Sequence, residues 1–159
     1  MAEFTHFNEN KEAVMVDISD KTDTVREAVA TGKIYMSPEC FDMVEKGQIE
    51  KGDVLSVARI AGIMGAKKTS ELIPLCHMIN LTKVEIEFEL KENCVTVFCK
   101  AKTIGKTGVE MEALQGVQTA LLCIYDMCKA VDKNMHLEDI HLCEKSGGKS
   151  GDFKYRSEA

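Results

Sequence analysis

Two stretches of alternating apolar and polar residues, joined by a short polar turn, limit most strongly what this chain can fold into. In residues 84–90 every second side chain is Val, Ile, Phe or Leu, and glutamates stand between them. Residues 95–101 alternate in a similar way after the turn at 91–93. A period of two places the apolar side chains of a strand on one face. The pattern therefore predicts a β-hairpin with one buried face.

Two helices are predicted before this hairpin from the signals at their ends. Ser37-Pro38 combines a capping hydroxyl with proline at the first helical position, and Gly47 is a typical helix stop. Asp53 is the expected cap of a second helix, which runs towards Lys67 and Lys68. Alanine and glycine recur in this second helix, so we expect a neighbouring backbone to approach it closely.

The longest predicted helix follows the hairpin. Thr107-Gly108-Val109-Glu110 matches a capping box, in which the first and fourth side chains bind free N–H groups of the helix start. An apolar stripe at helical spacing then runs from Leu114 to Val131. A final strand is expected around Ile140 and Leu142, before a tail rich in glycine and lysine.

Residues 24–36 give conflicting local signals. Thr24-Val25-Arg26-Glu27 matches a capping box and Gly32 a helix stop, which favours a helix, whereas Ile34-Tyr35-Met36 is typical of a strand. Taken as a strand, the segment completes a β-α-β-β-α-β order with one extra helix. That order indicates an α+β fold, a ferredoxin-like antiparallel sheet packed against helices.

Length and composition suit one globular domain. We assign residues 1–22 of the 159-residue chain to an N-terminal arm and residues 23–159 to a single domain. The net charge of −6 argues against nucleic acid as a partner, since phosphates require an excess of Lys and Arg. No apolar run approaches the roughly 18 residues that span a bilayer, and residues 1–10 lack a signal-peptide pattern. We therefore expect a cytoplasmic protein that does not contact membranes.

The cysteines and histidines carry little sign of a metal or nucleophile. The seven cysteines include no C-x-x-C pair, so we expect reduced thiols and no metal site. Cys76 and His77 follow Pro74 and resemble a nucleophile and its base, but adjacent residues rarely align in that way. We interpret Cys76 as a packed thiol and His77 as a residue able to contact an anion.

The glycine-lysine segment at residues 145–151 invites comparison with a phosphate-binding loop. The P-loop pattern requires glycine where Cys143 stands, and no helical pattern follows the segment. Lysines beside glycines can still bind phosphate through side chains and backbone N–H groups. From local sequence alone, a solvated tail is the favoured interpretation.

Three carboxylates lie on the long predicted helix. The capping box accounts for Glu110. Glu112 and Asp126 are 14 residues apart, nearly four turns, and are predicted on one face away from the apolar stripe. Solvation is the default interpretation of Glu112. Asp126 has mostly apolar helical neighbours and one cation, Lys129, so we weigh a shifted pKa and proton transfer against a simple ion pair.

Seven strings of this chain, taken together, resemble the cyclic pyranopterin monophosphate synthase family (molybdenum cofactor biosynthesis protein C). They cover nearly the whole chain in order, with Met78 as one departure, where the family often has proline. The resemblance implies a ferredoxin-like fold, and hence a strand over residues 25–36. The strings are Met15-Val16-Asp17-Ile18, Lys51-Gly52-Asp53-Val54, Ala58-Arg59-Ile60-Ala61-Gly62-Ile63, Leu72-Ile73-Pro74-Leu75-Cys76-His77, Gly105-Lys106-Thr107-Gly108-Val109-Glu110-Met111-Glu112-Ala113, Tyr125-Asp126-Met127-Cys128-Lys129-Ala130 and Lys145-Ser146-Gly147-Gly148-Lys149-Ser150-Gly151-Asp152-Phe153.

The resemblance also implies an activity. The enzyme would be a lyase of molybdenum cofactor biosynthesis that converts (8S)-3′,8-cyclo-7,8-dihydroguanosine 5′-triphosphate to cyclic pyranopterin monophosphate and pyrophosphate. Asp126, Lys129 and Lys51 would be catalytic. No cofactor is implied, although the triphosphate can carry Mg²⁺, and the oligomer would be a homohexamer, a trimer of dimers. The residues implied to bind substrate are Leu75, Cys76, His77, Met111, Glu112, Lys145 and Lys149.

Other functional classes give different expectations. A non-catalytic nucleotide-sensing oligomer would bind a triphosphate and leave it unchanged, and a pure interaction protein would do neither. For the enzyme, one geometric problem arises: Glu112 and Asp126 are roughly 21 Å apart along a straight helix. We therefore predict that the active site spans two subunits related by a two-fold axis.

Overall fold

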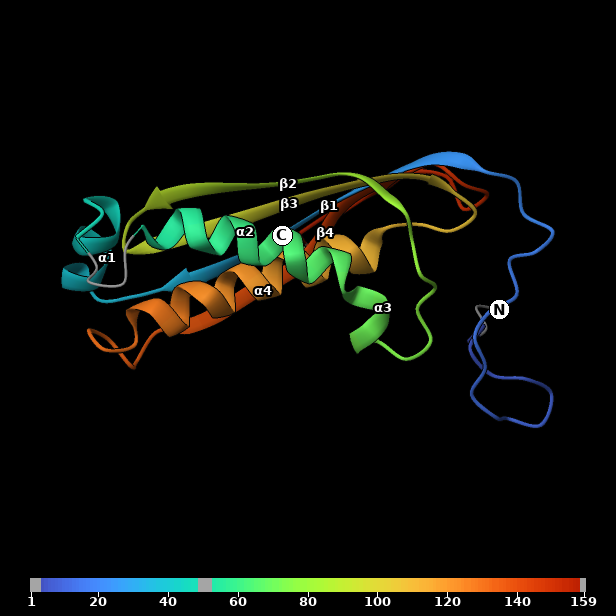
Figure 1. The fold of residues 1–159 in the computed structure, drawn as a ribbon, viewed down its shortest axis with the longest axis horizontal. Helices are drawn as coiled ribbons and strands as arrows, with labels where there is room; N and C mark the ends of the chain where they lie inside the picture. Colours follow the sequence, from blue (N-terminus) through green and yellow to red (C-terminus); the bar gives the residue numbers. More distant parts are fainter. Residues whose placement is uncertain (1–3, 49–52, 158–159) are drawn as a thin grey trace.

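A five-stranded antiparallel sheet with its long helices on one face forms the body of the protein (Figure 1). The computed structural model describes residues 4–48 and 53–157. The strands are β1 (Thr24–Tyr35), β2 (Leu81–Lys91), β3 (Cys94–Gly105), β4 (His136–Ser146) and β5 (Phe153–Lys154), and the helices are α1 (Pro38–Glu45), α2 (Val54–Lys67), α3 (Thr69–Leu72) and α4 (Glu110–Cys128).

The strand order confirms the predicted fold class. The sheet runs β2-β3-β1-β4-β5, with β1 antiparallel to both β3 and β4. Helix α2 connects β1 to β2, and α4 connects β3 to β4, which gives the β-α-β-β-α-β order, with α1 and the four-residue α3 as additional helices and β5 as an additional strand. The hairpin prediction is also confirmed: β2 pairs with β3, and Glu92 and Asn93 both adopt positive φ in the turn.

Residues 24–35 form β1, so the local signals for a helix there were wrong. Alternate residues of β1 face the helices, among them Ala28, Ala30 and Ile34, all buried. Gly32 does not stop a helix. A Cβ on it would lie 2.8 Å from side-chain atoms of both Leu121 and Val117, so glycine is needed for α4 to pack against the strand.

The predicted cap residues of α1 and α2 are confirmed, whereas the predicted capping box of α4 does not form. Ser37 Oγ accepts from the N–H of Cys40, and the Asp53 carboxylate accepts from the first turn of α2. Helix α4 begins at Glu110 after Val109, and no side chain caps it. Val109 is 1% exposed and belongs to the hydrophobic core, so the start of the helix is packed rather than capped by a side chain.

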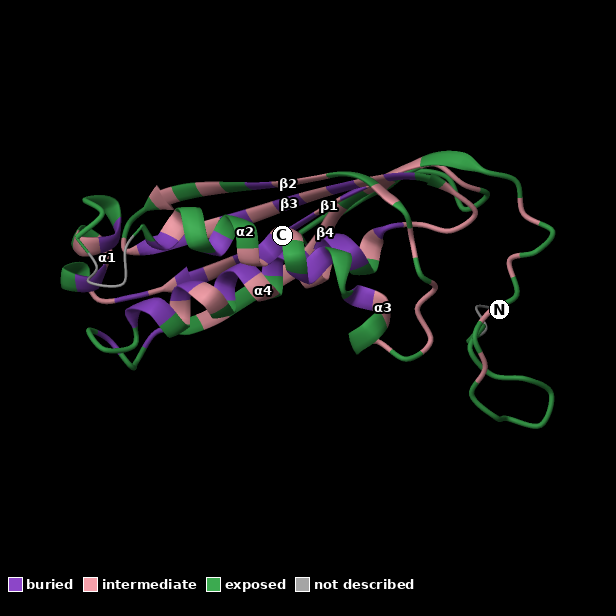
Figure 2. Ribbon diagram, viewed as in Figure 1, coloured by how far each residue is buried: buried purple, intermediate pink, exposed green. Residues whose placement is uncertain are grey.

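The small residues of α2 let it approach α4 closely, as predicted. A Cβ on Gly62 would lie 3.0 Å from the carbonyl oxygen of Gly116, and one on Gly65 would lie 2.2 Å from Thr119 Oγ1. Figure 2 shows buried residues recurring along both helices. This contact holds α4, which carries the candidate site residues at its two ends, firmly against the sheet.

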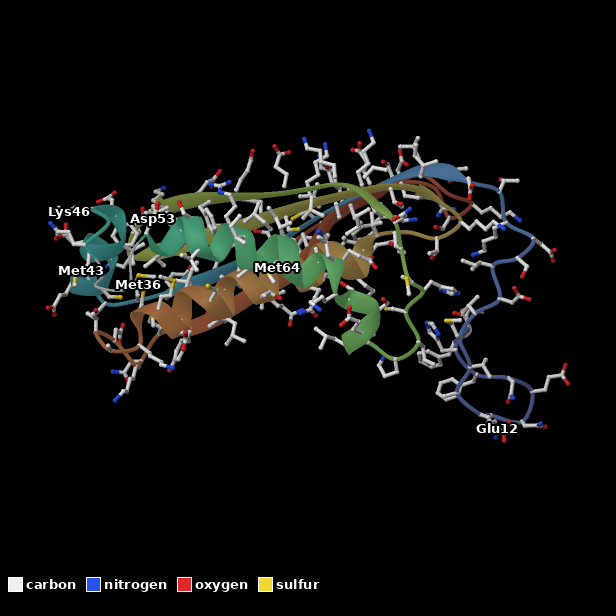
Figure 3. All side chains as sticks on the ribbon, in the orientation of Figure 1. Glu12, Met36, Met43, Lys46, Asp53 and Met64 are labelled. Atoms are coloured by element: carbon white, nitrogen blue, oxygen red, sulfur yellow. The ribbon has the colours of Figure 1, made fainter. Side chains whose placement is uncertain are left out.

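Two parts of the molecule lie outside this packing. The sheet face opposite the helices carries many exposed polar side chains (Figure 3). The segment before β1 extends from the end of the sheet where α4 begins, and its described part, residues 4–23, contains a bridge between Phe7 and Ala13. Within residues 4–48 and 53–157, no helix has the length and apolar character required to cross a bilayer.

Candidate active site

A small pocket lies at the N-terminal end of α4. The turn after Pro74 contributes Leu75, Cys76 and His77, and the first turn of α4 contributes Met111 and Glu112. Its volume is about 140 Å³. The fold thus brings together five of the residues predicted to bind substrate. We call this the base pocket, because its size suits a bicyclic base and not a whole nucleotide.

Glu112 is the chemically unusual group of the base pocket. Its side chain is 3% exposed, and its Oε2 has no hydrogen-bond partner among the described residues. Burial, with a smaller effect from the charge of Glu110, raises the pKa of Glu112 to about 7. The interpretation of Glu112 as a solvated residue was therefore wrong. The turn at residues 75–79 covers α4 at this end, which helical spacing by itself does not reveal.

An orphaned buried carboxylate oxygen favours a ligand that donates hydrogen bonds. Buried polar atoms in folded proteins are nearly always paired, so an unpaired one in a pocket indicates a place for a partner from outside. A ligand with adjacent N–H groups would satisfy Glu112, and the side chains of Leu75 and Met111 offer apolar walls for a ring.

Neither Cys76 nor His77 is arranged as a nucleophile and base. Burial, and then the charge of Glu112, raises the pKa of the Cys76 thiol, which disfavours the reactive thiolate. His77 Nε2 lies 2.7 Å from the carbonyl oxygen of Val16. With Nε2 donating to that carbonyl, Nδ1 remains for a ligand. His77 therefore joins the N-terminal segment to the base pocket.

A cationic hollow lies at the same end of the sheet, where β1 begins and β4 ends. Lys21, Arg26 and Lys149 line it, together with the backbone at Gly148. Gly148 has φ +82°, and a Cβ there would overlap the Arg26 guanidinium, so glycine allows loop and cation to lie together. Three cations and a glycine-rich backbone are suited to phosphate groups. We call this the cationic hollow.

Sequence reasoning missed Lys21 and Arg26 in this hollow. Arg26 had been placed in a helical capping box, and Lys21 in the N-terminal arm, where no local pattern marked either as a ligand. Lys145, predicted beside Lys149, lines a different depression. Its Nζ donates to Ser150 Oγ at 2.5 Å. The two lysines therefore flank one loop and do not share one hollow.

A third group lies at the opposite, C-terminal end of α4. Lys129 Nζ donates to Asp126 Oδ1 at 2.6 Å, and this hydrogen bond and the charge of Asp126 raise the pKa of Lys129. The mostly apolar helical neighbours of Asp126 do not bury it in the single chain, because its side chain is 60% exposed. Its apolar neighbour Leu122 is itself exposed and does not cover it. The third predicted catalytic residue, Lys51, lies outside the described residues.

The two ends of α4 are far apart in the molecule. The base pocket and the cationic hollow lie where β3 ends and α4 begins, whereas the Asp126–Lys129 pair lies near α1 (Figure 1). With about 1.5 Å of rise per residue, Glu112 and Asp126 are separated by roughly 21 Å along α4. One copy of this chain therefore does not bring the two groups together.

Comparison with known proteins assigns the chain to a family. The model of the MoaC family matches residues 15–148. The chain belongs to the MoaC family. A cyclic pyranopterin monophosphate synthase of Peptoclostridium acidaminophilum is 56% identical over 98% of this chain and 99% of its own length. Proteins of the same name from Heliobacterium modesticaldum and Listeria welshimeri are 58% and 55% identical, each over 96% of this chain and at least 96% of their own length.

Family membership agrees with the resemblance seen in the sequence strings. The MoaC match covers the base pocket apart from His6, the cationic hollow apart from its tail residues beyond 148, and the Asp126–Lys129 pair. Within residues 4–48 and 53–157, no group of three His, Cys, Asp or Glu side chains is placed to hold a metal ion. All seven cysteines are thiols.

Proposed function

We propose that this chain catalyses the reaction for which its relatives are named, the synthesis of cyclic pyranopterin monophosphate. The substrate would be (8S)-3′,8-cyclo-7,8-dihydroguanosine 5′-triphosphate, and pyrophosphate the second product. Relatives of this name at 55–58% identity over nearly the full length support the proposal. The observation that carries it in the structure is the buried, unpartnered carboxylate oxygen of Glu112 in a pocket of base size.

The base pocket suits the guanine-derived ring of this substrate. That ring presents adjacent N–H groups on one edge, and a carboxylate accepts two parallel N–H donors well. Glu112 would accept them in the ionised form, which a pKa near 7 makes accessible at neutral pH. Leu75, Cys76 and Met111 would pack against the ring faces, and His77 Nδ1 would be available to the sugar or phosphate.

The cationic hollow suits the triphosphate. A cyclic phosphate forms when a sugar hydroxyl oxygen attacks the α-phosphorus, loses its proton and displaces pyrophosphate. Lys21, Arg26 and Lys149 would stabilise the negative charge that develops on the leaving pyrophosphate, and Lys145 would act from the other side of the loop. We expect Mg²⁺ to arrive with the triphosphate, since carboxylate-poor sites of this kind bind Mg²⁺ mainly through phosphates.

Proton transfer would be the task of Asp126 and Lys129, with Lys51 assisting. A carboxylate and an ammonium joined by a 2.6 Å hydrogen bond can exchange a proton with a substrate that reaches both. Their exposure in the single chain leaves them open to such a substrate, and packing against a second subunit would then supply the desolvation that the single chain lacks.

A site built from two chains reconciles the two ends of α4. We propose that the base pocket and cationic hollow of one chain face the Asp126–Lys129 pair of a neighbour across a two-fold axis, which creates two equal sites. Three such dimers would give the hexamer expected from the family. We also propose that the enzyme works in the cytoplasm, where seven reduced thiols are stable.

Pyrophosphate release from the cyclised guanosine triphosphate tests the activity directly. We expect the wild type to release pyrophosphate, and Asp126→Asn to be slower by about two to four orders of magnitude while keeping its fold. Asp42→Asn is the matched control, because Asp42 forms a similar surface pair with Lys46, at 2.7 Å, on a helix without proposed function. A wild type that binds the substrate without releasing pyrophosphate would favour the nucleotide-sensing alternative.

A further inference from the structure

Residues 6–14 form a small hairpin that is stabilised by its own hydrogen bonds. The N–H of Val14 donates to the carbonyl oxygen of His6, and the N–H of Asn8 donates to that of Glu12. The Asn8 side chain accepts from the N–H groups of Asn10 and Glu12 and donates to the Glu12 carboxylate. We call this unit the N-terminal hairpin. It projects from the body of the protein, with Glu12 at its outer end (Figure 3).

The N-terminal hairpin is attached beside the base pocket by the segment that follows it. His77 Nε2 lies 2.7 Å from the carbonyl oxygen of Val16, and Lys106 Nζ donates to the carbonyl oxygen of Ser19 at 3.0 Å. His77 belongs to the pocket itself, and Lys106 directly precedes its Thr107. These two hydrogen bonds, one from each side of the pocket, therefore fix the segment to which the hairpin is joined.

His6, at the base of the hairpin, lines the base pocket opposite residues of the core. It lines the same pocket as Cys76, Thr107 and Glu112, although more than 100 positions separate it from Glu112 in sequence. The hairpin is held by its own hydrogen bonds rather than by deep packing, since Phe7 is 55% exposed. It can therefore shift as a unit without disturbing the core.

The guanine-derived ring requires a donor as well as an acceptor. Its N–H edge is matched by the carboxylate of Glu112, but its ring carbonyl oxygen accepts a hydrogen bond and would be left unpaired by carboxylates alone. Among the described residues, the His6 ring has no hydrogen-bond partner, whereas His77 already uses one ring nitrogen on Val16. An imidazole N–H can donate to a carbonyl oxygen in either tautomer.

We propose that His6 is a substrate-contacting residue of the base pocket, that it donates to the ring carbonyl of a guanine-derived ligand, and that the N-terminal hairpin positions it. The proposal rests on the proposed function for the identity of the ligand. It adds a side chain from outside the MoaC match, which begins at residue 15. Ligand binding would then draw the hairpin against the pocket.

Steady-state kinetics with the cyclised guanosine triphosphate give the first test. One lost hydrogen bond to a neutral ligand group corresponds to about a 3- to 10-fold effect, so we expect His6→Ala to raise KM by that factor. His6→Gln retains an N–H donor and is expected to recover part of the loss. Asn8→Ala, which removes three bonds of the hairpin, should raise KM as His6→Ala does. Glu9→Ala changes an exposed hairpin residue outside the pocket and should behave as wild type. Wild-type KM for His6→Ala would overturn the proposal.

Protection from trypsin gives a second test that does not depend on turnover. Guanosine triphosphate carries the same ring carbonyl and serves as a stable probe. We expect it to slow cleavage after Lys11 at least threefold in the wild type, and to have little effect in His6→Ala. Equal cleavage rates with and without the probe in the wild type would overturn the proposal. Protection by the probe in a wild type that releases no pyrophosphate would refute the proposed function and support the His6 contact.

Discussion

The buried carboxyl of Glu112 makes a prediction about stability that needs no substrate. Its pKa is about 7 in the folded protein against 4.5 in a model compound, because burial disfavours the charged form. Below pH 4.5 the group is protonated in both folded and unfolded chains. As the pH rises from 4.5 through 7, the unfolded chain releases this proton first, so the free energy of unfolding falls. Above pH 7 the loss is complete.

The size of the effect follows from the two pKa values. The difference between 4.5 and about 7, at about 1.4 kcal/mol per pH unit, amounts to about 3–4 kcal/mol. Glutamine has the shape of the protonated acid and does not titrate. Relative to wild type, Glu112→Gln is therefore expected to gain about 3–4 kcal/mol between pH 4 and pH 8.5.

Urea unfolding at the two pH values measures this gain. Wild type and variant are compared at equal protein concentration, since any assembly adds to apparent stability. Glu87→Gln, at an exposed position on β2, is the matched control for the loss of one charge. If the stability difference between Glu112→Gln and wild type is the same at pH 4 and pH 8.5, Glu112 is not desolvated as described.

Three further predictions concern the proposed site and the helix contact. Glu112→Ala and Asp126→Asn should each be nearly inactive alone. Mixed dimers of the two variants should regain part of the pyrophosphate release, because one of their two sites carries no mutation. No recovery in verified mixed dimers argues against a shared site. Lys21→Ala and Lys149→Ala should weaken substrate binding, with a deficit that shrinks as salt is added, and a salt-independent deficit would contradict a role on phosphate. Gly65→Ala should cost about 1–3 kcal/mol, because its Cβ would lie 2.2 Å from Thr119 Oγ1. In urea unfolding, Thr119→Ala should remove most of that cost, and an undiminished cost would place the strain elsewhere.

Local sequence patterns were sufficient for most of the fold. The alternation in β2 and β3 gave the hairpin, and the cap residues Ser37 and Asp53 gave the helix starts, because these signals act between residues close in the chain. The seven sequence strings spread along the chain were sufficient to identify the family. They also named Leu75 to His77 with Met111 and Glu112 as pocket residues, and the fold brings all five together.

Tertiary structure decided what depends on neighbours distant in sequence. Residues 24–35 carry helix signals yet form the central strand, because pairing on both sides by β3 and β4 outweighs weak local preferences. Helical spacing placed Glu112 and Asp126 on one face, but the turn at 75–79 buries Glu112, whereas the Asp126 side chain is 60% exposed. Burial, and with it the pKa of a carboxyl group, depends on what packs over a residue. Spacing along a helix specifies the direction of a side chain but not what packs over it. His6, Lys21 and Arg26 became candidate site residues in the folded chain, because the fold places each of them beside residues that are distant in sequence.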